Sequence, residues 1–214
     1  MTQDFVHLRM HTEFSIKDGM LNPKKVVHKA IASGMKALAI TDATAMFGDV
    51  IFYKAASAAG IKPILGADCS ITNHYNRDDY LRLLFLARNH QGYLTLCDLL
   101  SRAWLTNQYK DRGEVDLDWI TPEMADGLIV LSGFNTGAIG KAILNGSSSA
   151  AEQEARRLSQ KFPHFFMELQ RVGRPNDEML VAESVKLAKK LGLPVVATQP
   201  IQFENPEDFE FHEA

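Results

Sequence analysis

Three polar side chains near the start of the sequence have the types and the spacing of a metal-binding motif. His7, Arg9 and His11 alternate with apolar residues, and Asp18 follows in a turn closed by Gly19. On a β-strand this alternation places the three polar side chains on one face. Imidazoles two residues apart, with a nearby carboxylate, are typical ligands of zinc or manganese in hydrolases. Arg9, however, is always cationic and cannot bind a metal, so the pattern indicates a metal-enzyme framework that has lost part of its ligand set.

Further carboxylates follow other expected strands. Asp42 comes directly after an apolar run ending at Thr41, and Asp68 lies in the run 62–71. In a parallel βα barrel the loops at the carboxyl ends of the strands build the active site, so these side chains could join His11 and Asp18 in a metal cluster. The alternative interpretation is that they cap helices or bind loop amides.

Short strand-like runs alternate with helical patterns along the whole chain. Most of these runs are continuously apolar, as expected of parallel strands covered on both faces. Asn22-Pro23 is an N-cap with proline at the first helical position, and Gly34, Gly60 and Gly192 mark helix ends. The seven expected strands are 5–10, 37–41, 62–71, 81–87, 127–132, 165–170 and 194–198.

The order of these elements predicts an α/β fold. Seven βα units without a central switch point favour a barrel, and a doubly wound sheet is the alternative. The polar segment 73–79 is expected to join two neighbouring strands as a hairpin turn, and 104–124 to form a surface insertion with a short helix after Thr121-Pro122. A helix that starts at Asn205-Pro206 is cut at Ala214, which predicts an N-terminal fragment of a longer chain.

The composition excludes several classes of protein. A formal net charge of −3 gives no basic field for nucleic acid, so little direct DNA binding is expected. Two cysteines without paired spacing argue against a disulfide scaffold and for a reducing cytoplasm. The first residues lack a signal-peptide pattern, and no apolar run approaches the roughly 20 residues of a membrane helix. We expect a cytoplasmic protein without a membrane partner, with Cys69 and Cys97 in its core.

Several ordered motifs resemble one family. FVHLRMHTEFSIKDGM is similar to HLHxHSxxSxxDG, the opening motif of the PHP (polymerase and histidinol phosphatase) domain at the start of bacterial DNA polymerase III alpha subunits. LAITDATAMFG resembles the family's LAxTDHGNMFG, and FYKAASAAGIKPILGADCSI resembles FYxxAxxxGIKPIIGxExY. Later matches are LARNHQGYLTLCDLLSRA, GLIVLSGF, FFMELQRVGRP and GLPVVATQPIQF. Because they follow in order across residues 1–214, the chain is identified as a PHP domain of this polymerase type.

The resemblance implies a distorted seven-stranded βα barrel with up to three metal ions held by nine ligands. Only His11, Asp18 and Asp68 keep a plausible ligand, and the family distributes these three among different ions. The other positions have lost theirs, so we expect no metal cofactor and no catalytic residue here. The nine vestigial positions are Arg9, His11, Asp18, Ala43, Asp68, Arg82, Phe134, Pro200 and Gln202.

The resemblance also implies a role. The parent chain would be a DNA-directed DNA polymerase whose nucleotidyl-transfer aspartates lie beyond Ala214, while this domain is inactive. It would act as a structural and docking module for the proofreading exonuclease subunit, the rest of the alpha subunit and the holoenzyme. A residual metal-dependent phosphoesterase acting on pyrophosphate or a DNA 3′ end is the alternative, and a free-standing phosphatase is disfavoured.

Arginine is expected to replace the missing metals electrostatically. Two carboxylates in a partly dry pocket repel each other unless a cation lies nearby, and guanidinium groups remain charged when buried. We therefore predict that Arg9 contacts Asp18 or Asp68 and that Arg82 is a second partner. His7 is expected to be a core histidine, and five others are expected to lie on the surface or in loops without partners: His28, His74, His90, His164 and His212.

Overall fold

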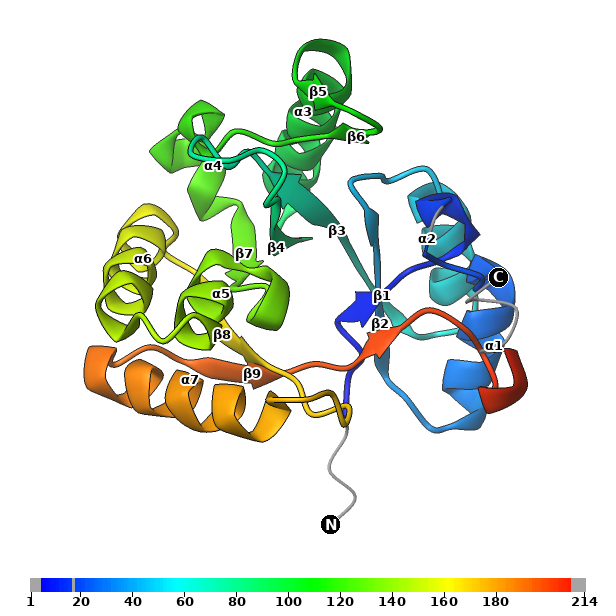
Figure 1. Cartoon of the computed structure of the whole chain (residues 1–214). Helices are drawn as coiled ribbons and strands as arrows, with labels where there is room; N and C mark the ends of the chain where they lie inside the picture. Colours follow the sequence, from blue (N-terminus) through cyan, green and yellow to red (C-terminus); the bar gives the residue numbers. More distant parts are fainter. Residues whose placement is uncertain (1–4, 17, 209–214) are drawn as a thin grey trace. The chain divides into compact units, whose positions relative to one another are not determined.

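The computed structural model describes residues 5–16 and 18–208 (Figure 1). The chain divides into two compact units, one of residues 1–68 and 200–214 and the other of residues 69–199. The boundary falls within one strand, between Asp68 and Cys69. Of the helix expected from Asn205-Pro206, the structure describes a single 3₁₀ turn at Pro206–Asp208, and the continuation lies outside the described residues.

The first unit contains two parallel strand pairs and two helices. Its strand β1 pairs with β10, and β2 pairs with β3 along its whole length. This register sets Arg9 beside Pro200 and Ala43 beside Asp68. The elements are β1 (Arg9–Met10), η1 (Glu13–Ser15), α1 (Pro23–Ala32), β2 (Ala37–Ala43), α2 (Asp49–Ala58), β3 (Lys62–Ile71), β10 (Pro200–Ile201) and η4 (Pro206–Asp208).

Helix α1 begins at a side-chain N-cap and packs its buried face against the core of the first unit. The Asn22 side chain accepts hydrogen bonds from the backbone N–H groups of Lys24 and Lys25 at 3.1 and 3.3 Å, and these bonds begin the helix as its N-cap. The buried face of α1, which includes Val27, packs in a core with apolar residues of β1, β2 and α2. This packing fixes β1 and β2, whose ends carry the candidate site.

The second unit is built on the strand order β4-β7-β8-β9, with α5 packed against α6 and α7 (Figure 1). Strands β4 and β7 are antiparallel, and the other two pairs are parallel. The elements are β4 (Leu81–Ala87), α3 (His90–Thr106), β5 (Gln108–Tyr109), β6 (Arg112–Gly113), η2 (Leu117–Trp119), α4 (Pro122–Asp126), β7 (Leu128–Leu131), η3 (Phe134–Thr136), α5 (Ala138–Leu144), α6 (Ser148–Lys161), β8 (Phe165–Leu169), α7 (Asp177–Leu191) and β9 (Val195–Ala197).

Two glycines allow α3 to approach the start of β7. A Cβ atom on Gly92 would lie 1.8 Å from the carbonyl oxygen of Gly127, a distance that no side chain tolerates. The ring of Phe85 on β4 meets Phe162 edge to face, with centroids 5.9 Å apart. The core of this unit therefore depends on close backbone contact as well as on aromatic packing.

The α/β class is confirmed, and each of the seven expected strands is present. The prediction for the first strand was too long, because the extended pairing covers only Arg9–Met10. Most of the strands were expected to be parallel, and the pair of β4 with β7 is antiparallel. Periodicity does not encode strand direction, and a polar turn such as 73–79 reverses the chain without a crossover helix.

The segment 104–124 is more than a surface insertion. Its first residues end α3, and the expected helix after Thr121 is confirmed as α4. Between them, Glu114 and Val115 are fully buried. The Val115 N–H donates to the carbonyl of Ser70 at 2.8 Å, so this part of the segment is attached to β3 as part of the core. Among the described residues no helix is long and apolar enough to cross a bilayer.

Candidate functional site

A buried ion pair in the first unit links Arg9, the first residue of β1, to Asp68 in β3. Arg9 is only 5% exposed and Asp68 is completely buried. The guanidinium Nη1 of Arg9 donates a hydrogen bond to Oδ2 of Asp68. The predicted contact between Arg9 and one of the two carboxylates is therefore confirmed, with Asp68 as the partner.

His11 extends this pair to a second carboxylate. Its backbone N–H donates to the carbonyl of Ile201 at 2.9 Å, so pairing with β10 fixes its position. Ring atom Nε2 lies 3.1 Å from Oδ2 of Asp68, and Nδ1 lies 2.9 Å from Oδ1 of Asp18. Arg9, Asp68, His11 and Asp18 thus form a continuous chain of contacts, which we call the Arg9 cluster.

The protonation of His11 follows from this arrangement. Each ring nitrogen faces a carboxylate oxygen, and only the doubly protonated imidazolium supplies a donor to both. Burial lowers the pKa of His11, but its hydrogen bonds to Asp18 and Asp68 and the charges of these two groups outweigh burial, so the pKa is raised above 6.5. The Arg9 cluster therefore combines two cations with two carboxylates.

This donor set does not fit the metal ions that the PHP resemblance implies. A metal-bound histidine must offer a neutral nitrogen lone pair, yet both nitrogens of His11 are engaged by carboxylates. Oδ2 of Asp68 already contacts Arg9 and His11. A divalent cation here would have to displace a guanidinium whose charge cannot be removed by deprotonation.

The remaining vestigial positions carry no histidine, cysteine or carboxylate. In the first unit, Ala43 ends β2, Pro200 lies in β10, and Gln202 accepts the Met20 N–H through its backbone oxygen at 2.8 Å. In the second unit, Arg82 lies in β4 and Phe134 is buried in η3. The structure thus brings Arg9, His11, Asp18 and Asp68 together, whereas a contact of Arg82 with their carboxylates stays a prediction.

Asp42 has the loop-binding role that the alternative interpretation gave it. It accepts hydrogen bonds from the backbone N–H of Thr12 at 2.6 Å and from the hydroxyl groups of Thr12 and Ser15 at 2.8 and 2.7 Å. The Ser15 hydroxyl in turn accepts the N–H of Ala43 at 3.0 Å. Asp42 therefore holds η1 against β2 and directs His11 towards its partners.

Sequence reasoning missed Asp49, the first residue of α2. Asp49 is 1% exposed, and among the described residues neither of its carboxylate oxygens has a hydrogen-bond partner. Burial, with a contribution from the charge of Asp42, raises the pKa of Asp49 to about 8. An acidic residue at a helix N-terminus usually faces solvent, and the only available signal was the apolar character of its neighbours Phe47 and Val50.

The expectations for His7, the cysteines and one histidine are only partly confirmed. His7 is half-buried, and burial lowers its pKa. Cys69 is buried as expected, but Cys97 is partly exposed because it lies at the edge of the packed face of α3. His74, expected to lack a partner, has Nε2 3.4 Å from Oδ1 of Asp116.

Comparison with known proteins places this geometry in a family. The family model described as "PHP domain" matches residues 7–172, a range that holds Arg9, His11, Asp18 and Asp68. The chain belongs to the PHP domain family. Curated relatives of this PHP domain are DNA polymerase III subunit alpha of Neisseria meningitidis serogroup B, 46% identical over 98% of the chain, and that of Escherichia coli K12, 41% identical over 98%. The chain spans 19% and 18% of their lengths, about a fifth.

Solved structures share the fold of this PHP domain at low sequence identity. An amidohydrolase from Chromobacterium violaceum aligns with a TM-score of 0.64 and 13% identity, covering 97% of this chain and 95% of its own. A proposed metal-dependent phosphoesterase from Bifidobacterium adolescentis aligns with a TM-score of 0.56 and 12% identity, covering 94% and 89%. The fold of this PHP domain is therefore shared with proteins of different sequence.

Proposed function

We propose that this PHP domain is the N-terminal part of a bacterial DNA polymerase III alpha subunit. In this proposal the domain hydrolyses no phosphoester. It serves as a structural and docking module in DNA replication. Support for the parent chain comes from identities of 41–46% with alpha subunits over nearly all of the chain. In this proposal the parent chain is a cytoplasmic polymerase, and its nucleotidyl transfer is carried out by residues beyond Ala214.

The contact of Arg9 with Asp68 carries the proposal of inactivity. Hydrolysis by a metal-activated water needs a cation with at least three protein ligands and an open position. In the Arg9 cluster a guanidinium and an imidazolium supply the positive charge that metal ions would supply. Because the carboxylates already have these partners, the cluster is stable without a metal and has no nucleophile to activate.

A hydrolysis assay tests this part of the proposal. Pyrophosphate and single-stranded DNA with a free 3′ end would be incubated with the chain and Mn²⁺ or Zn²⁺, with and without a chelator. We expect no turnover above that of a His11→Gln variant, which has lost the imidazole of the cluster. Turnover that the chelator abolishes and that His11→Gln lacks would overturn the inactive assignment.

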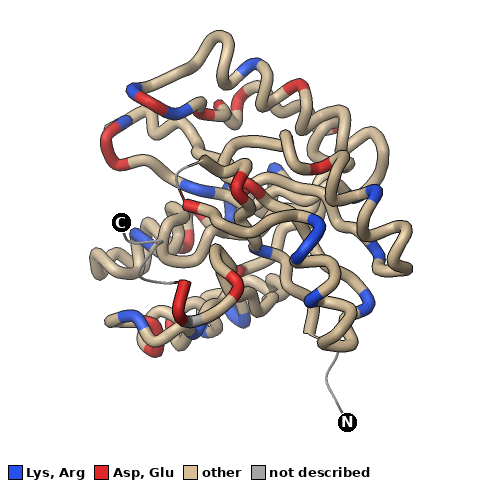
Figure 2. Tube along the Cα trace, turned by 90° about the vertical axis from the view of Figure 1, so that its right-hand side faces the viewer, with Lys and Arg blue, Asp and Glu red and all other residues tan. Residues whose placement is uncertain are grey.

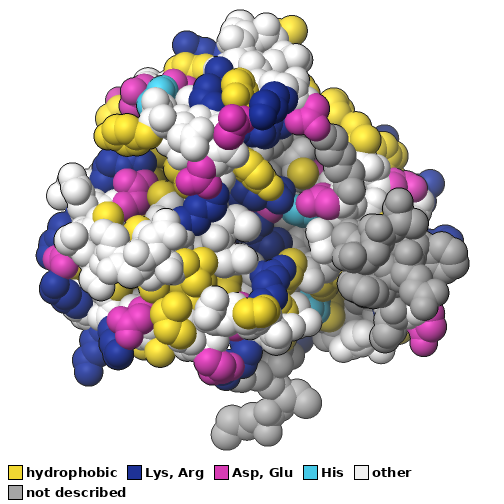
Figure 3. Space-filling model, in the orientation of Figure 1, with side chains coloured by type: hydrophobic (Ala, Val, Ile, Leu, Met, Phe, Trp, Pro, Cys, Tyr) yellow, Lys and Arg dark blue, Asp and Glu magenta, His cyan; other side chains and the backbone are white. Residues whose placement is uncertain are grey.

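The partner in this proposal is the proofreading exonuclease subunit, with the rest of the alpha subunit and the holoenzyme. Exposed apolar side chains near the start of α2 support a docking role, since Phe47, Val50 and Tyr53 are each more than half exposed. On the face seen in Figure 3, apolar side chains lie in small groups among charged ones. Lys/Arg and Asp/Glu residues are interspersed along the trace in Figure 2, which is consistent with little direct DNA binding.

Calorimetry against the exonuclease subunit tests the docking role. We expect a micromolar or tighter Kd. The double substitution Phe47→Ala with Tyr53→Ala should raise this Kd about tenfold or more, because exposed aromatic residues are the usual anchors of an interface. Leu105, which is 82% exposed on α3, provides the matched control Leu105→Ala. Absence of binding by the folded chain would contradict the docking role.

A residual metal-dependent phosphoesterase is the second candidate. One observation favours it: His11, Asp18 and Asp68, the three positions that keep a ligand type, lie together in the first unit. For this function the carboxylates would have to release Arg9 and the imidazole before binding an ion. The hydrolysis assay with His11→Gln separates the two candidates.

A further inference from the structure

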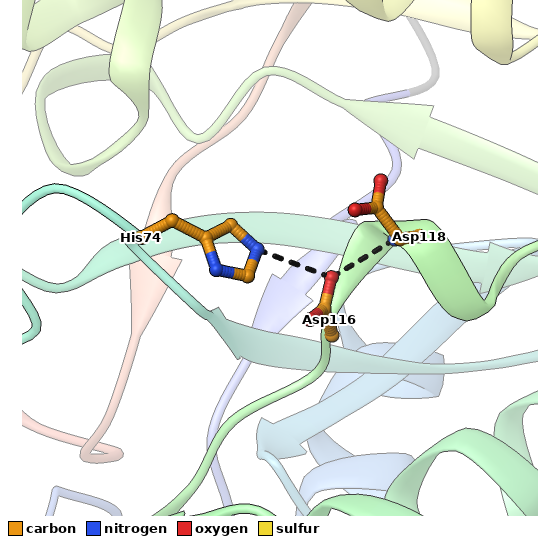
Figure 4. Close-up of side chains that lie close together, drawn as sticks. All are labelled: His74, Asp116 and Asp118. Atoms are coloured by element: carbon orange, nitrogen blue, oxygen red, sulfur yellow. Dashed lines mark hydrogen bonds and ion pairs between the residues drawn. The ribbon is translucent and has the colours of Figure 1, made fainter.

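Outside the Arg9 cluster, an imidazole and two carboxylates meet in the second unit (Figure 4). His74 comes from the connection between β3 and β4, and Asp116 and Asp118 come from the start of η2. One ligand atom of each residue lies within 4.8 Å of the other two. In the part of the chain that the structure describes, no other group of three histidine, cysteine or carboxylate side chains is arranged in this way.

The backbone holds the two segments side by side. The N–H of Val115 donates to the carbonyl of Ser70 at 2.8 Å, and the N–H of Thr72 donates to the carbonyl of Val115 at 3.0 Å. Asp116 therefore follows a residue paired to the end of β3, and His74 lies two residues beyond Thr72. Their separation is set by main-chain pairing and does not depend on the side chains themselves.

Local hydrogen bonds fix the direction of both segments. Oδ1 of Asn73 accepts the N–H groups of Tyr75 and Asn76 at 3.1 and 3.3 Å, which shapes the turn that presents His74. Oδ1 of Asp116 accepts the N–H of Asp118 at 3.0 Å and so caps η2. Both ligand-bearing turns are thus formed in advance, and binding an ion would require adjustment of side chains only.

Charged groups of both signs line the cavity beside these residues, with three carboxylates (Asp116, Asp118 and Glu154) against two guanidinium groups (Arg82 and Arg157). Asp116 and Asp118 are close, and the nearby guanidinium of Arg157 is held by Glu154 through bonds of 2.8 and 2.7 Å. The pKa of Arg157 is raised chiefly by its bond to Glu154 and, to a smaller extent, by the charge of Asp118. Because Glu154 binds Arg157, the carboxylates at this cavity outnumber the guanidinium groups by one, and a cation beside His74 would balance that excess.

We propose that His74, Asp116 and Asp118 bind one divalent transition-metal ion, with zinc as the preferred ion and manganese as a weaker one. An imidazole with two carboxylates suits these ions, whereas calcium and magnesium prefer oxygen ligands alone. Three protein ligands leave a position for water in tetrahedral zinc, and the His74 side chain, 61% exposed, is open to solvent. The ion would join the β3–β4 connection to the η2 segment beside a small cavity of about 70 Å³.

This inference concerns residues that are not family ligand positions, so it is independent of the proposed inactivity of the Arg9 cluster. The test is a calorimetric titration of the purified chain with zinc chloride. We expect one ion per chain, and a Kd raised about tenfold or more by His74→Ala and by Asp118→Asn. Asp118→Asn is preferred to a change at Asp116 because it leaves the cap of η2 intact.

Two controls complete the test. His90→Ala removes an exposed histidine from the start of α3, and it should leave the Kd unchanged. His11→Gln should also leave it unchanged; zinc binding lost in His11→Gln but kept in His74→Ala would overturn this inference and the inactivity of the Arg9 cluster together. No saturable zinc binding, or equal binding by all variants, would overturn this inference alone.

A second readout does not depend on the zinc affinity. Mn²⁺ is paramagnetic, so a bound ion should broaden the NMR resonance of the His74 ring proton selectively at low metal-to-protein ratios. Uniform broadening of all exposed histidine signals would contradict a site at His74. Circular dichroism of each variant would verify that it is folded.

Discussion

Arg9 and Asp68 form a buried ion pair that joins β1 to β3 within the first unit. Asp68 is completely buried, and Arg9 is 5% exposed. Taking two charges out of water is unfavourable, and their attraction offsets this only while both partners are present. The pair is therefore a point at which a single substitution should have a large effect on stability.

Replacing Arg9 with alanine should lower the free energy of unfolding by roughly 3–5 kcal/mol, because Asp68 is left buried without its guanidinium partner. Urea denaturation of both proteins measures the difference. The matched control is Arg88→Ala, since Arg88 forms an exposed pair with Asp126 at 3.3 Å and an exposed pair contributes about 1 kcal/mol or less. If both substitutions lowered the free energy of unfolding by the same amount, the ion pair of Arg9 with Asp68 would contribute no more than an exposed pair.

Restoring a histidine at position 9 should not restore a metal site in the first unit. Arg9→His supplies one ligand, but Ala43 and Pro200 still provide none. The substitution would be made together with His74→Ala, so that the site proposed in the second unit does not contribute. Plasma mass spectrometry after dialysis should then find less than one ion per chain, and a stoichiometric ion would refute the assignment.

The stability contributed by His11 should decrease as the pH rises. Its pKa in the folded chain is raised above 6.5, so its charged form is favoured by folding. This contribution is fully present below pH 6.5 and is lost as the pH passes through the folded pKa. NMR titration of the His11 ring proton gives that pKa, and the pH dependence of unfolding should be smaller in His11→Gln. A midpoint below 6.5 would contradict the Arg9 cluster as described.

Asp49 should make the protein less stable at neutral pH than in mild acid. Its pKa of about 8 in the folded chain, against 3.8 ordinarily, means that the unfolded state loses its proton first. The free energy of unfolding should therefore fall by up to about 1.4 kcal/mol per pH unit between these values. In Asp49→Asn this slope should be reduced and stability at pH 8 increased, as measured by urea denaturation. Asp98→Asn, at an exposed carboxylate on α3, should leave the slope unchanged.

Much of the fold and part of the candidate site could be predicted from the sequence. Apolar runs and helix caps located the strands and α1, because these signals are local. The pairing of Arg9 with a carboxylate also followed from residue types, since a buried guanidinium requires such a partner. The antiparallel pairing of β4 with β7 and the burial of Val115 could not be predicted, because both depend on contacts between distant segments.

The same limit applies to Asp49 and to His74. Their residue types are common at helix starts and in turns, and the apolar neighbours of Asp49 were the only signal that set either residue apart. Burial makes Asp49 unusual, and the pairing of Val115 with the end of β3 brings Asp116 to His74. Such features become visible only when the tertiary contacts are known.

The hydrogen bonds of Asp42 make this residue harder to replace than its neighbour Ala43 in β2. Asp42 binds the backbone and hydroxyl groups of Thr12 and the hydroxyl group of Ser15, so any replacement would release these donors and loosen the turn. The methyl group of Ala43 makes no hydrogen bond, and a side chain at that position can change without this penalty. Substitution of Ala43 should therefore be tolerated where substitution of Asp42 is not, so two adjacent residues of β2 differ in how freely they can vary.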